Sequence, residues 1–278
     1  MLVASIIGQG TMEKKVVAIT GASSGIGEAV ERLLLAKSFV VVGIARSFQS
    51  KVLQRVGPDL FHIHCDITKT DEVAECFQSI FSKFQHVDVL INNAGSGIAA
   101  TVEDISTEDI DNELAINFKA HLYCIKAVMK QMRQQKSGHI INVISVGGRL
   151  TYPTIPLYDA AKHAMLSVAE SLSWELKPWG ITVSSIEPGA IKTHFGKNMK
   201  RSSGESDYKA YYISANQGFA RMYKKPQTPE HVAEVIYKAI RNKGWKYNTS
   251  HKDLLRVAAY RFLPKRWYDA IIYHYFNL

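Results

Sequence analysis

Short apolar runs alternate with longer amphipathic stretches along most of this 278-residue chain. Runs of this length predict buried strands, and each gap between them is long enough for a crossover helix. The alternation therefore predicts βαβ units in a doubly wound parallel sheet, a Rossmann-type α/β fold with helices on both faces. The predicted strands span 16–20, 39–44, 60–65, 87–92, 139–145 and 181–187. The first predicted helix follows the glycine-rich segment at 20–27 and ends at about Lys37, and the others span 70–84, 107–135 and 156–177.

We expect a single catalytic domain over residues 14–250, because a chain of this length with 46% hydrophobic residues can bury one full core. Residues 1–13 form an N-terminal extension that lacks the basic and apolar regions of a signal peptide. The pattern loosens over 194–227, which we interpret as a mobile substrate lid. Residues 251–278 form a basic, aromatic tail of two helix-length pieces separated by Pro264.

A glycine-rich segment follows the first predicted strand and opens the first predicted helix. In this context glycines permit a tight turn and let a pyrophosphate approach the helix N-terminus. The segment predicts a dinucleotide site, and an ordinary glycine-rich turn is the alternative. The candidate cofactor contacts are Gly21, Ser23, Ser24, Gly25, Ile26 and Gly27.

Tyr158 and Lys162 lie four residues apart on the helix predicted at 156–177, so they share one face. A nearby ammonium favours the phenolate and lowers a tyrosine pKa that is ordinarily too high for proton exchange at neutral pH. The pair predicts acid–base chemistry, and a surface pair without a function is the alternative.

Several short motifs, in order and in register, resemble the classical short-chain dehydrogenase/reductase family over about residues 14–195. They are TGxxxGIG at 20–27, NNAG at 92–95, Asn117, Ser145, YxxxK at 158–162, and Pro188 with Gly189. Within that family the chain looks like the branch that includes hydroxysteroid dehydrogenase-like and acyl-ketone reductase-like members. The segments that suggest this branch are 95–97, 186–189, 262–264 and 267–269.

The resemblance implies a catalytic tetrad of Asn117, Ser145, Tyr158 and Lys162. Tyr158 would protonate a carbonyl oxygen while a nicotinamide delivers hydride, and Lys162 would lower the pKa of Tyr158 and hold the nicotinamide ribose. Ser145 would hydrogen-bond the substrate oxygen, and Asn117 would fix a water that relays protons to Lys162. The resemblance also implies cofactor contacts at Asp66, Ile67, Asn93, Ala94, Gly95, Pro188, Gly189, Ile191 and Thr193, although an Asp such as Asp66 commonly serves a turn instead.

Arg46 and Ser47 follow the second predicted strand, where no Asp or Glu occurs. An acidic residue at this place binds the ribose 2′-hydroxyl of NAD, whereas an Arg accommodates the 2′-phosphate of NADP. The pair therefore predicts NADP(H) in preference to NAD(H). The alternative is that Arg46 is a solvated loop residue.

These features together predict an NADP(H)-dependent oxidoreductase that interconverts a carbonyl and an alcohol. The lid aromatics suggest an apolar substrate such as a steroid, a retinoid or an acyl ketone. Two rivals remain: a non-catalytic NADP(H)-binding regulator, which we would expect to lack a catalytic residue, and a sugar-nucleotide epimerase or dehydratase. The lid aromatics are Tyr208, Tyr211, Tyr212, Phe219 and Tyr223.

The formal charge of +9 is not accompanied by an arginine-rich arm, zinc-ligand spacing or a helix-turn-helix signal, so we expect neither nucleic acid nor metal as a ligand. Cys65, Cys76 and Cys124 are scattered, which favours a reducing, cytoplasmic compartment. Family members often pair through two long helices, so we expect a homodimer or homotetramer by analogy. The tail could contact a membrane peripherally, although packing on its own domain or on a second subunit is the interpretation we favour.

Overall fold

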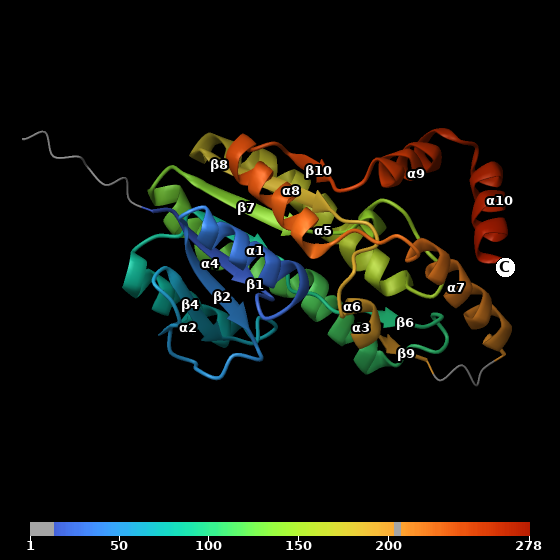
Figure 1. The fold of residues 1–278 in the computed structure, drawn as a ribbon, viewed down its shortest axis with the longest axis horizontal. Helices are drawn as coiled ribbons and strands as arrows, with labels where there is room; N and C mark the ends of the chain where they lie inside the picture. The colour runs from blue at the N-terminus through green and yellow to red at the C-terminus, as the bar shows by residue number, and fades with distance from the viewer. Residues whose placement is uncertain (1–13, 203–206) are drawn as a thin grey trace, which may run out of the picture.

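The computed structural model describes residues 14–202 and 207–278, so the extension predicted at 1–13 lies outside the described residues. An eight-stranded sheet crosses the centre of the molecule, with helices packed on both of its faces (Figure 1). All of the predicted strands form. They are β1 (Val16–Thr20), β2 (Val40–Ala45), β4 (Leu60–His64), β5 (Val89–Asn92), β7 (Gly138–Val143) and β8 (Ile181–Glu187).

The strand order is β10-β8-β7-β5-β1-β2-β4-β3, in which β3 (Gln54–Arg55) and β10 (Lys246–Asn248) were not predicted. Every pair in this sheet is parallel except the antiparallel pair of β3 with β4. The direction of winding reverses at β1, which pairs with β2 on one side and β5 on the other. A ligand crevice is expected at the carboxyl ends of the strands beside such a reversal.

Two cores lie on opposite faces of the sheet. Val17 and Ile19 of β1 pack with α1 (Gly25–Ala36) and α8 (Pro229–Asn242). Ala18 of β1 packs on the other face, which is covered by α2 (Thr70–Phe84), α4 (Ala120–Gln134) and α5 (Pro156–Leu176). Because both faces are covered, successive residues of the strand are all apolar, which explains the unbroken apolar runs in the sequence.

The helix predicted at 107–135 is interrupted. It consists of α3 (Thr107–Leu114), a π-helical turn at Ala115–Lys119, and α4. A π turn adds a residue to one helical turn and frequently occurs at functional sites. The amphipathic pattern continues through it, which is why the sequence predicted one continuous helix.

The segment predicted as a lid contains α6 (Phe195–Asn198), β9 (Lys200–Arg201) and the 14-residue helix α7 (Lys209–Met222). β9 pairs with β6 (Ile98–Ala99) in a small second sheet. The sequence predicted loosened structure here, but its scattered apolar residues are enough for α7 because they pack against the tail.

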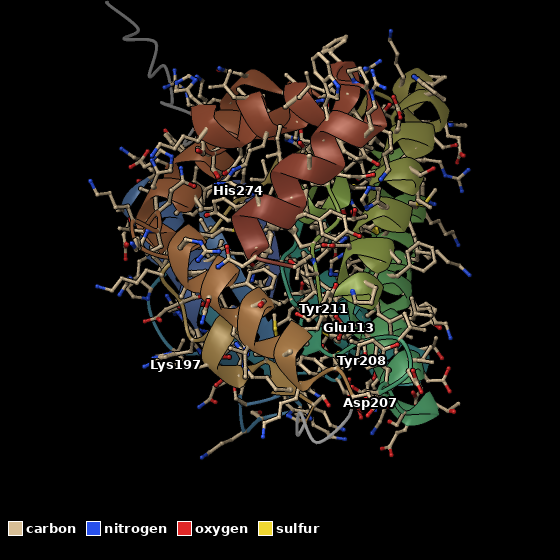
Figure 2. All side chains as sticks on the ribbon, turned by 90° about the vertical axis from the view of Figure 1, so that its right-hand side faces the viewer. Glu113, Lys197, Asp207, Tyr208, Tyr211 and His274 are labelled. Carbon is tan, nitrogen blue, oxygen red and sulfur yellow. The ribbon has the colours of Figure 1, made fainter. Side chains whose placement is uncertain are left out.

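The tail forms α9 (His251–Phe262) and α10 (Lys265–Phe276), separated at Pro264. α10 packs on α7, and Figure 2 shows both helices at the end of the molecule that carries the tail. Phe276 is 1% exposed, with its ring 5.4 Å from that of Phe219. The tail therefore packs on its own domain through one face. None of the helices in the described part of the chain is both long and apolar enough to span a bilayer.

Candidate active site

The glycine-rich segment forms a tight turn between β1 and α1. Gly21 and Gly25 have φ angles of +67° and +58°, which favour glycine. A Cβ on Gly21 would lie 2.8 Å from the Cα of Ala94. The Asn93 side chain donates to the carbonyl oxygens of Thr20 and Gly21 at 3.0 and 3.2 Å. The turn is thus held against the end of β5 and leaves the N-terminus of α1 facing the strand ends.

A cavity of about 1170 Å³ runs from this turn along the carboxyl ends of the strands to α7. Most residues predicted for the site line it, although they come from seven separate stretches of the chain. They are Gly21, Ser23, Ser24, Gly25, Ile26, Arg46, Ser47, Ile67, Asn93, Ala94, Gly95, Ser145, Tyr158, Lys162, Pro188, Gly189, Ile191 and Thr193.

Three predicted residues lie behind the cavity wall. Gly27 is packed against the backbone of the glycine turn, so a side chain there would collide with the Gly21 carbonyl. Asp66 accepts hydrogen bonds from the backbone N–H and hydroxyl of Thr68 at 3.1 and 2.7 Å, which is the turn role weighed for it. Asn117 is buried in the π turn.

The side chains predicted for proton transfer converge on one wall. Tyr158 and Lys162 project from α5, and Ser145 follows the end of β7 and hydrogen-bonds the Tyr158 hydroxyl. The Ser145 hydroxyl oxygen also accepts the N–H of Gly147 at 3.0 Å. Lys162 Nζ lies 5.6 Å from the centroid of the Tyr158 ring and donates to the Val143 carbonyl at 3.4 Å.

Burial controls the protonation of this pair. It raises the pKa of Tyr158 above its ordinary value, and the hydrogen bond with Ser145 opposes that rise only in part. The lowered tyrosine pKa expected from the sequence is therefore wrong for the protein without ligand, because desolvation of the phenolate dominates. Burial also lowers the pKa of Lys162 from 10.5 to about 8, while Glu113 acts in the opposite direction.

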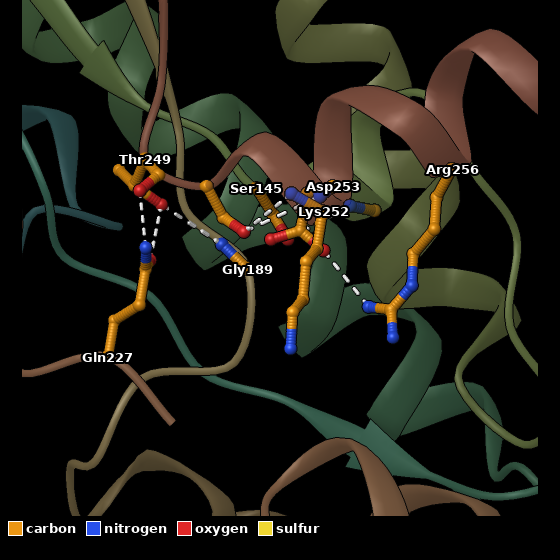
Figure 3. Close-up of polar contacts among 9 residues, drawn as sticks. Ser145, Gly189, Gln227, Thr249, Lys252, Asp253 and Arg256 are labelled. Atoms are coloured by element: carbon orange, nitrogen blue, oxygen red, sulfur yellow. Dashed lines mark hydrogen bonds and ion pairs between the residues drawn. The ribbon is translucent and has the colours of Figure 1, made fainter. Parts of the chain in front are cut away.

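The start of the tail and the residues before it pack against Gly189, a lining residue of the cavity, and sequence reasoning missed these contacts. The N–H of Gly189 donates to the Thr249 hydroxyl at 3.4 Å, and that hydroxyl donates to Gln227 at 2.7 Å (Figure 3). The Asp253 carboxylate lies against Gly189 and pairs with Arg256 at 2.9 Å. A capping serine before α9 was a local signal for the helix start, but no local signal indicated these contacts.

The far end of the cavity combines aromatic rings with polar residues that include Lys197, Arg201 and Asn216. The Phe195 ring centroid lies 5.7 Å from that of Tyr158. Of the five lid aromatics, Phe219 and Tyr223 line the cavity, whereas the Tyr212 hydroxyl donates to Asp104 at 2.6 Å. Further apolar lining residues, which the sequence did not single out, are Tyr152, Phe195, Met199 and Met222.

Metal-ligating side chains and thiols are the other candidates for chemistry in this chain. Within residues 14–202 and 207–278, no three His, Cys, Asp or Glu side chains converge as a set of metal ligands. Cys65, Cys76 and Cys124 are buried free thiols. A hydrogen bond with Cys65, together with burial, raises the pKa of Cys76, which disfavours the reactive thiolate.

Sequence comparison shows relatives along nearly the whole chain. A family model described as short chain dehydrogenase matches residues 15–204. A probable short-chain type dehydrogenase/reductase, VdlC of Helicobacter pylori, is 30% identical, with 91% of this chain and 94% of the relative covered. A 3-ketodihydrosphingosine reductase of Bacteroides thetaiotaomicron is 29% identical, with 88% and 91% covered.

Solved structures share the fold. A short-chain dehydrogenase of Streptomyces avermitilis matches with a TM-score of 0.78 at 25% identity, covering 90% of this chain and 93% of that one. ElxO with NADP bound matches with a TM-score of 0.73 at 25% identity, covering 87% of this chain and 100% of that one. A short-chain dehydrogenase/reductase of Burkholderia phymatum in complex with NAD shares the fold, with a TM-score of 0.77 at 21% identity. The match covers 88% of this chain and 92% of that one. From its motifs, its cavity and these matches, the chain belongs to the short-chain dehydrogenase family of oxidoreductases.

Proposed function

We propose that this protein is an NADP(H)-dependent oxidoreductase that interconverts a carbonyl and an alcohol on an apolar substrate. The observation that carries the proposal is the convergence of Ser145, Tyr158 and Lys162 on one cavity that also reaches the glycine turn. A proton donor and a nucleotide-binding turn in one cavity are what hydride transfer to a carbonyl requires.

The glycine turn fits a dinucleotide. Left-handed Gly21 and Gly25 leave room that a Cβ would fill, since a Cβ on Gly25 would lie 3.3 Å from Thr193 Cγ2. The N-terminus of α1 offers backbone N–H groups and a favourable dipole to a pyrophosphate. Gly21, Gly25 and Ile26 would hold that group, Asn93 and Lys162 the nearby ribose, and Ile191 and Thr193 the nicotinamide end.

Each catalytic side chain has a defined task in the reduction. The nicotinamide, when bound, supplies a hydride for the carbonyl carbon. Tyr158 donates its hydroxyl proton to the carbonyl oxygen, and the Ser145 hydroxyl stabilises the charge that develops there. Lys162 holds a positive charge beside Tyr158 and favours its release of the proton. Asn117 positions a water behind Lys162.

The NADP(H) preference is supported by Arg46 and Ser47. Both side chains are exposed where β2 ends and both line the cavity. A guanidinium there can pair with a 2′-phosphate, and no carboxylate follows β2 to bind a 2′-hydroxyl. Structural neighbours bind either NADP or NAD, as their descriptions state.

An apolar substrate is supported by the end of the cavity that faces Tyr158. Phe195, Phe219 and Tyr223 supply aromatic surface there, and such surface favours steroid, retinoid or acyl-ketone substrates. One of the relatives is named as a reductase of 3-ketodihydrosphingosine, a ketone.

The test measures NADPH oxidation by the purified protein with ketosteroids, retinal, long-chain acyl ketones and small diketones. Tyr158→Phe is the control because it removes only the hydroxyl. We expect turnover with at least one apolar ketone and a loss of roughly 100-fold or more in the variant. Tight NADPH binding without turnover across the panel would favour the regulator instead.

We also propose that the protein is cytoplasmic and forms a homodimer or homotetramer through α4 and α5. The free, buried thiols support a reducing compartment, and Trp174 on α5 is exposed. Light scattering should report a dimer or tetramer, and a monomer would contradict the assembly. Cell fractionation tests the location.

Peripheral membrane contact through the tail is a further proposal. α9 and α10 expose Leu255, Phe262 and Trp267, with Arg261 and Arg266 nearby in the sequence. Exposed aromatic and basic residues together favour an anionic bilayer surface. Replacing the three apolar residues by Ser should abolish flotation with anionic vesicles. Equal flotation of the variant, or none by the wild type, would remove the proposal.

A further inference from the structure

A column of buried polar side chains follows three successive turns next to the catalytic lysine. Glu113 at the end of α3, Asn117 in the π turn and His121 in α4 are each four residues apart, and each is at most 1% exposed. Both carboxylate oxygens of Glu113, Asn117 Oδ1 and His121 Nδ1 are buried and lack a well-aligned hydrogen-bond partner among the described residues. Buried polar atoms of this kind are normally partnered, often by ordered water.

The column faces Lys162. A Cβ on Gly95 would lie 2.9 Å from Asn117 Oδ1 and 3.7 Å from Lys162 Nζ, so the amide and the ammonium border the same small space. The Asn117 side-chain amide donates to the Glu113 carbonyl at 3.3 Å and the Ser96 carbonyl at 3.0 Å. These two bonds fix the amide so that its oxygen is the atom left to face Lys162.

The carboxylate of Glu113 interacts with the Ser96 side chain and the backbone N–H of Ile98, both neutral groups. A basic side chain would suit the dipole at the C-terminal end of α3 better than this carboxylate does. Lys162, 3% exposed, is the buried cation that interacts with it. A buried acid that faces a buried catalytic base without a close ion pair is a candidate for proton exchange.

We propose that Glu113 is a positioning residue that supplies and accepts the proton of Lys162, through water held by Asn117. This inference rests on the proposed function. During reduction the Tyr158 O–H bond breaks as the alcohol O–H bond forms, and the hydride from the nicotinamide completes the new C–H bond. Lys162 then returns a proton to Tyr158, the Glu113 carboxylic acid returns one to Lys162, and solvent reprotonates Glu113. Oxidation reverses each transfer.

The protonation energetics fit such an exchange. Burial raises the pKa of Glu113 from 4.5 to about 7, with Lys162 acting against it, and burial lowers that of Lys162 to about 8. The two groups therefore titrate close to each other and to neutral pH, where proton transfer between them is nearly balanced. The other groups that act on Glu113 are Ser96, the backbone N–H of Ile98, and Asp109, and Glu113 in turn raises the pKa of Tyr158.

His121, the third residue of the column, is a neutral imidazole at neutral pH. Its Nε2 lies 2.8 Å from the Ala94 carbonyl, to which it can donate only if it carries the proton. Burial, with Lys162 acting in the same direction, lowers the pKa of His121 to about 3, so it does not compete for the proton at neutral pH. This leaves Glu113 as the titrating group of the column.

The first readout uses the full-length, cofactor-free protein labelled with ¹³C-lysine. The Lys162 Cε resonance, identified by its loss in Lys162→Met, reports the lysine pKa. In Glu113→Gln that pKa should fall by about 1 unit, because the negative charge that favours the ammonium is removed. Glu108→Gln removes the same charge from the exposed first turn of α3 and should leave the resonance titration unchanged.

The second readout is the pH profile of kcat for NADPH-dependent reduction. In Glu113→Gln the fall in kcat at alkaline pH should move to lower pH by as much as the Lys162 pKa falls. KM for the ketone should stay unchanged. Glu113→Asp should lie between wild type and Glu113→Gln in both readouts. If Glu113→Gln does not fold, the aspartate variant decides the question alone.

An unchanged Lys162 titration in a variant with the wild-type melting temperature would overturn the role of Glu113. A shifted titration with an unmoved kcat profile would also overturn it, because the charge would then act on the lysine without taking part in proton delivery. A wild-type protein without any Tyr158-dependent turnover would instead remove the proposed function, and the cofactor-free titration would still report the Glu113–Lys162 contact.

Discussion

The carboxylate of Asp253, at the start of α9, lies directly against Gly189, the second residue after β8. The tail therefore packs behind Gly189, which lines the cavity. Only the absence of a side chain at Gly189 allows this approach, since a Cβ there would collide with the carboxylate.

Gly189→Ala should destabilise the protein by about 1–3 kcal/mol, because either the loop or α9 must move. NADPH affinity should fall with it, since Gly189 lines the cavity. Urea unfolding and NADPH fluorescence measure the two effects. Adding Asp253→Ala to Gly189→Ala removes the colliding carboxylate and should restore part of the stability and part of the NADPH affinity. If the losses of the two single variants simply add in the double variant, the contact is contradicted.

Arg46→Ala should weaken NADPH binding roughly tenfold or more, because a charged hydrogen bond to the 2′-phosphate is lost. NADH binding should change little. Arg133→Ala is a matched control, because Arg133 is also exposed but stacks on Trp179, in the segment that precedes β8. Fluorescence titration measures the dissociation constants, and equal losses for both cofactors would reject the NADP(H) assignment.

Asp159 should make stability depend on pH. Burial raises its pKa from 3.8 to about 8, and its carboxylate accepts the N–H of Tyr152 at 2.7 Å. Between about pH 4 and 8 the unfolded chain releases this proton while the folded protein keeps it, so the free energy of unfolding should fall by up to about 1.4 kcal/mol per pH unit. Below that window both states are protonated and the contribution is absent.

Asp159→Asn keeps an acceptor for Tyr152 and removes the titration. The free energy of unfolding of the variant should therefore rise relative to that of the wild type as the pH increases from 4 to 8. Chemical denaturation at several pH values measures this difference. A difference that stays constant over the window would show that Asp159 ionises normally in the folded protein.

Phe276→Ala should destabilise the protein by about 3–5 kcal/mol, because Phe276 is almost fully buried between Gly218, Phe219 and Tyr152. The loss should release α10 from α7. Phe262→Ala removes the same ring from a side chain that is 78% exposed, so it should change stability by no more than about 0.5 kcal/mol. Comparable melting temperatures for the two variants would contradict the packing of the tail.

Much of the fold could be predicted because its signals are local. The periodicity of Thr70–Phe84 predicted α2 with its observed bounds, and the apolar runs predicted each long strand. Pro264 marked the break between α9 and α10. The short strands β3 and β10 escaped prediction, because two or three residues carry no periodicity and pair only when a neighbouring strand is already in place.

The candidate site divides in the same way. Motif spacing alone singled out Ser145, Tyr158 and Lys162, but it indicated a lowered tyrosine pKa that burial reverses. Nothing near Glu113 in the sequence marks it as a neighbour of Lys162, because α3 and α5 meet only after the chain has crossed the sheet.

The sequence by itself determined the doubly wound architecture, the family and the side chains available for proton transfer, because helix and strand periodicity and motif spacing act over a few residues. The tertiary structure decided that the tail packs against Gly189, that Asn117 lies in a π turn, and that Glu113 is buried near Lys162. These features depend on contacts between distant segments, and on the desolvation that those contacts impose on charged groups, which no local pattern encodes.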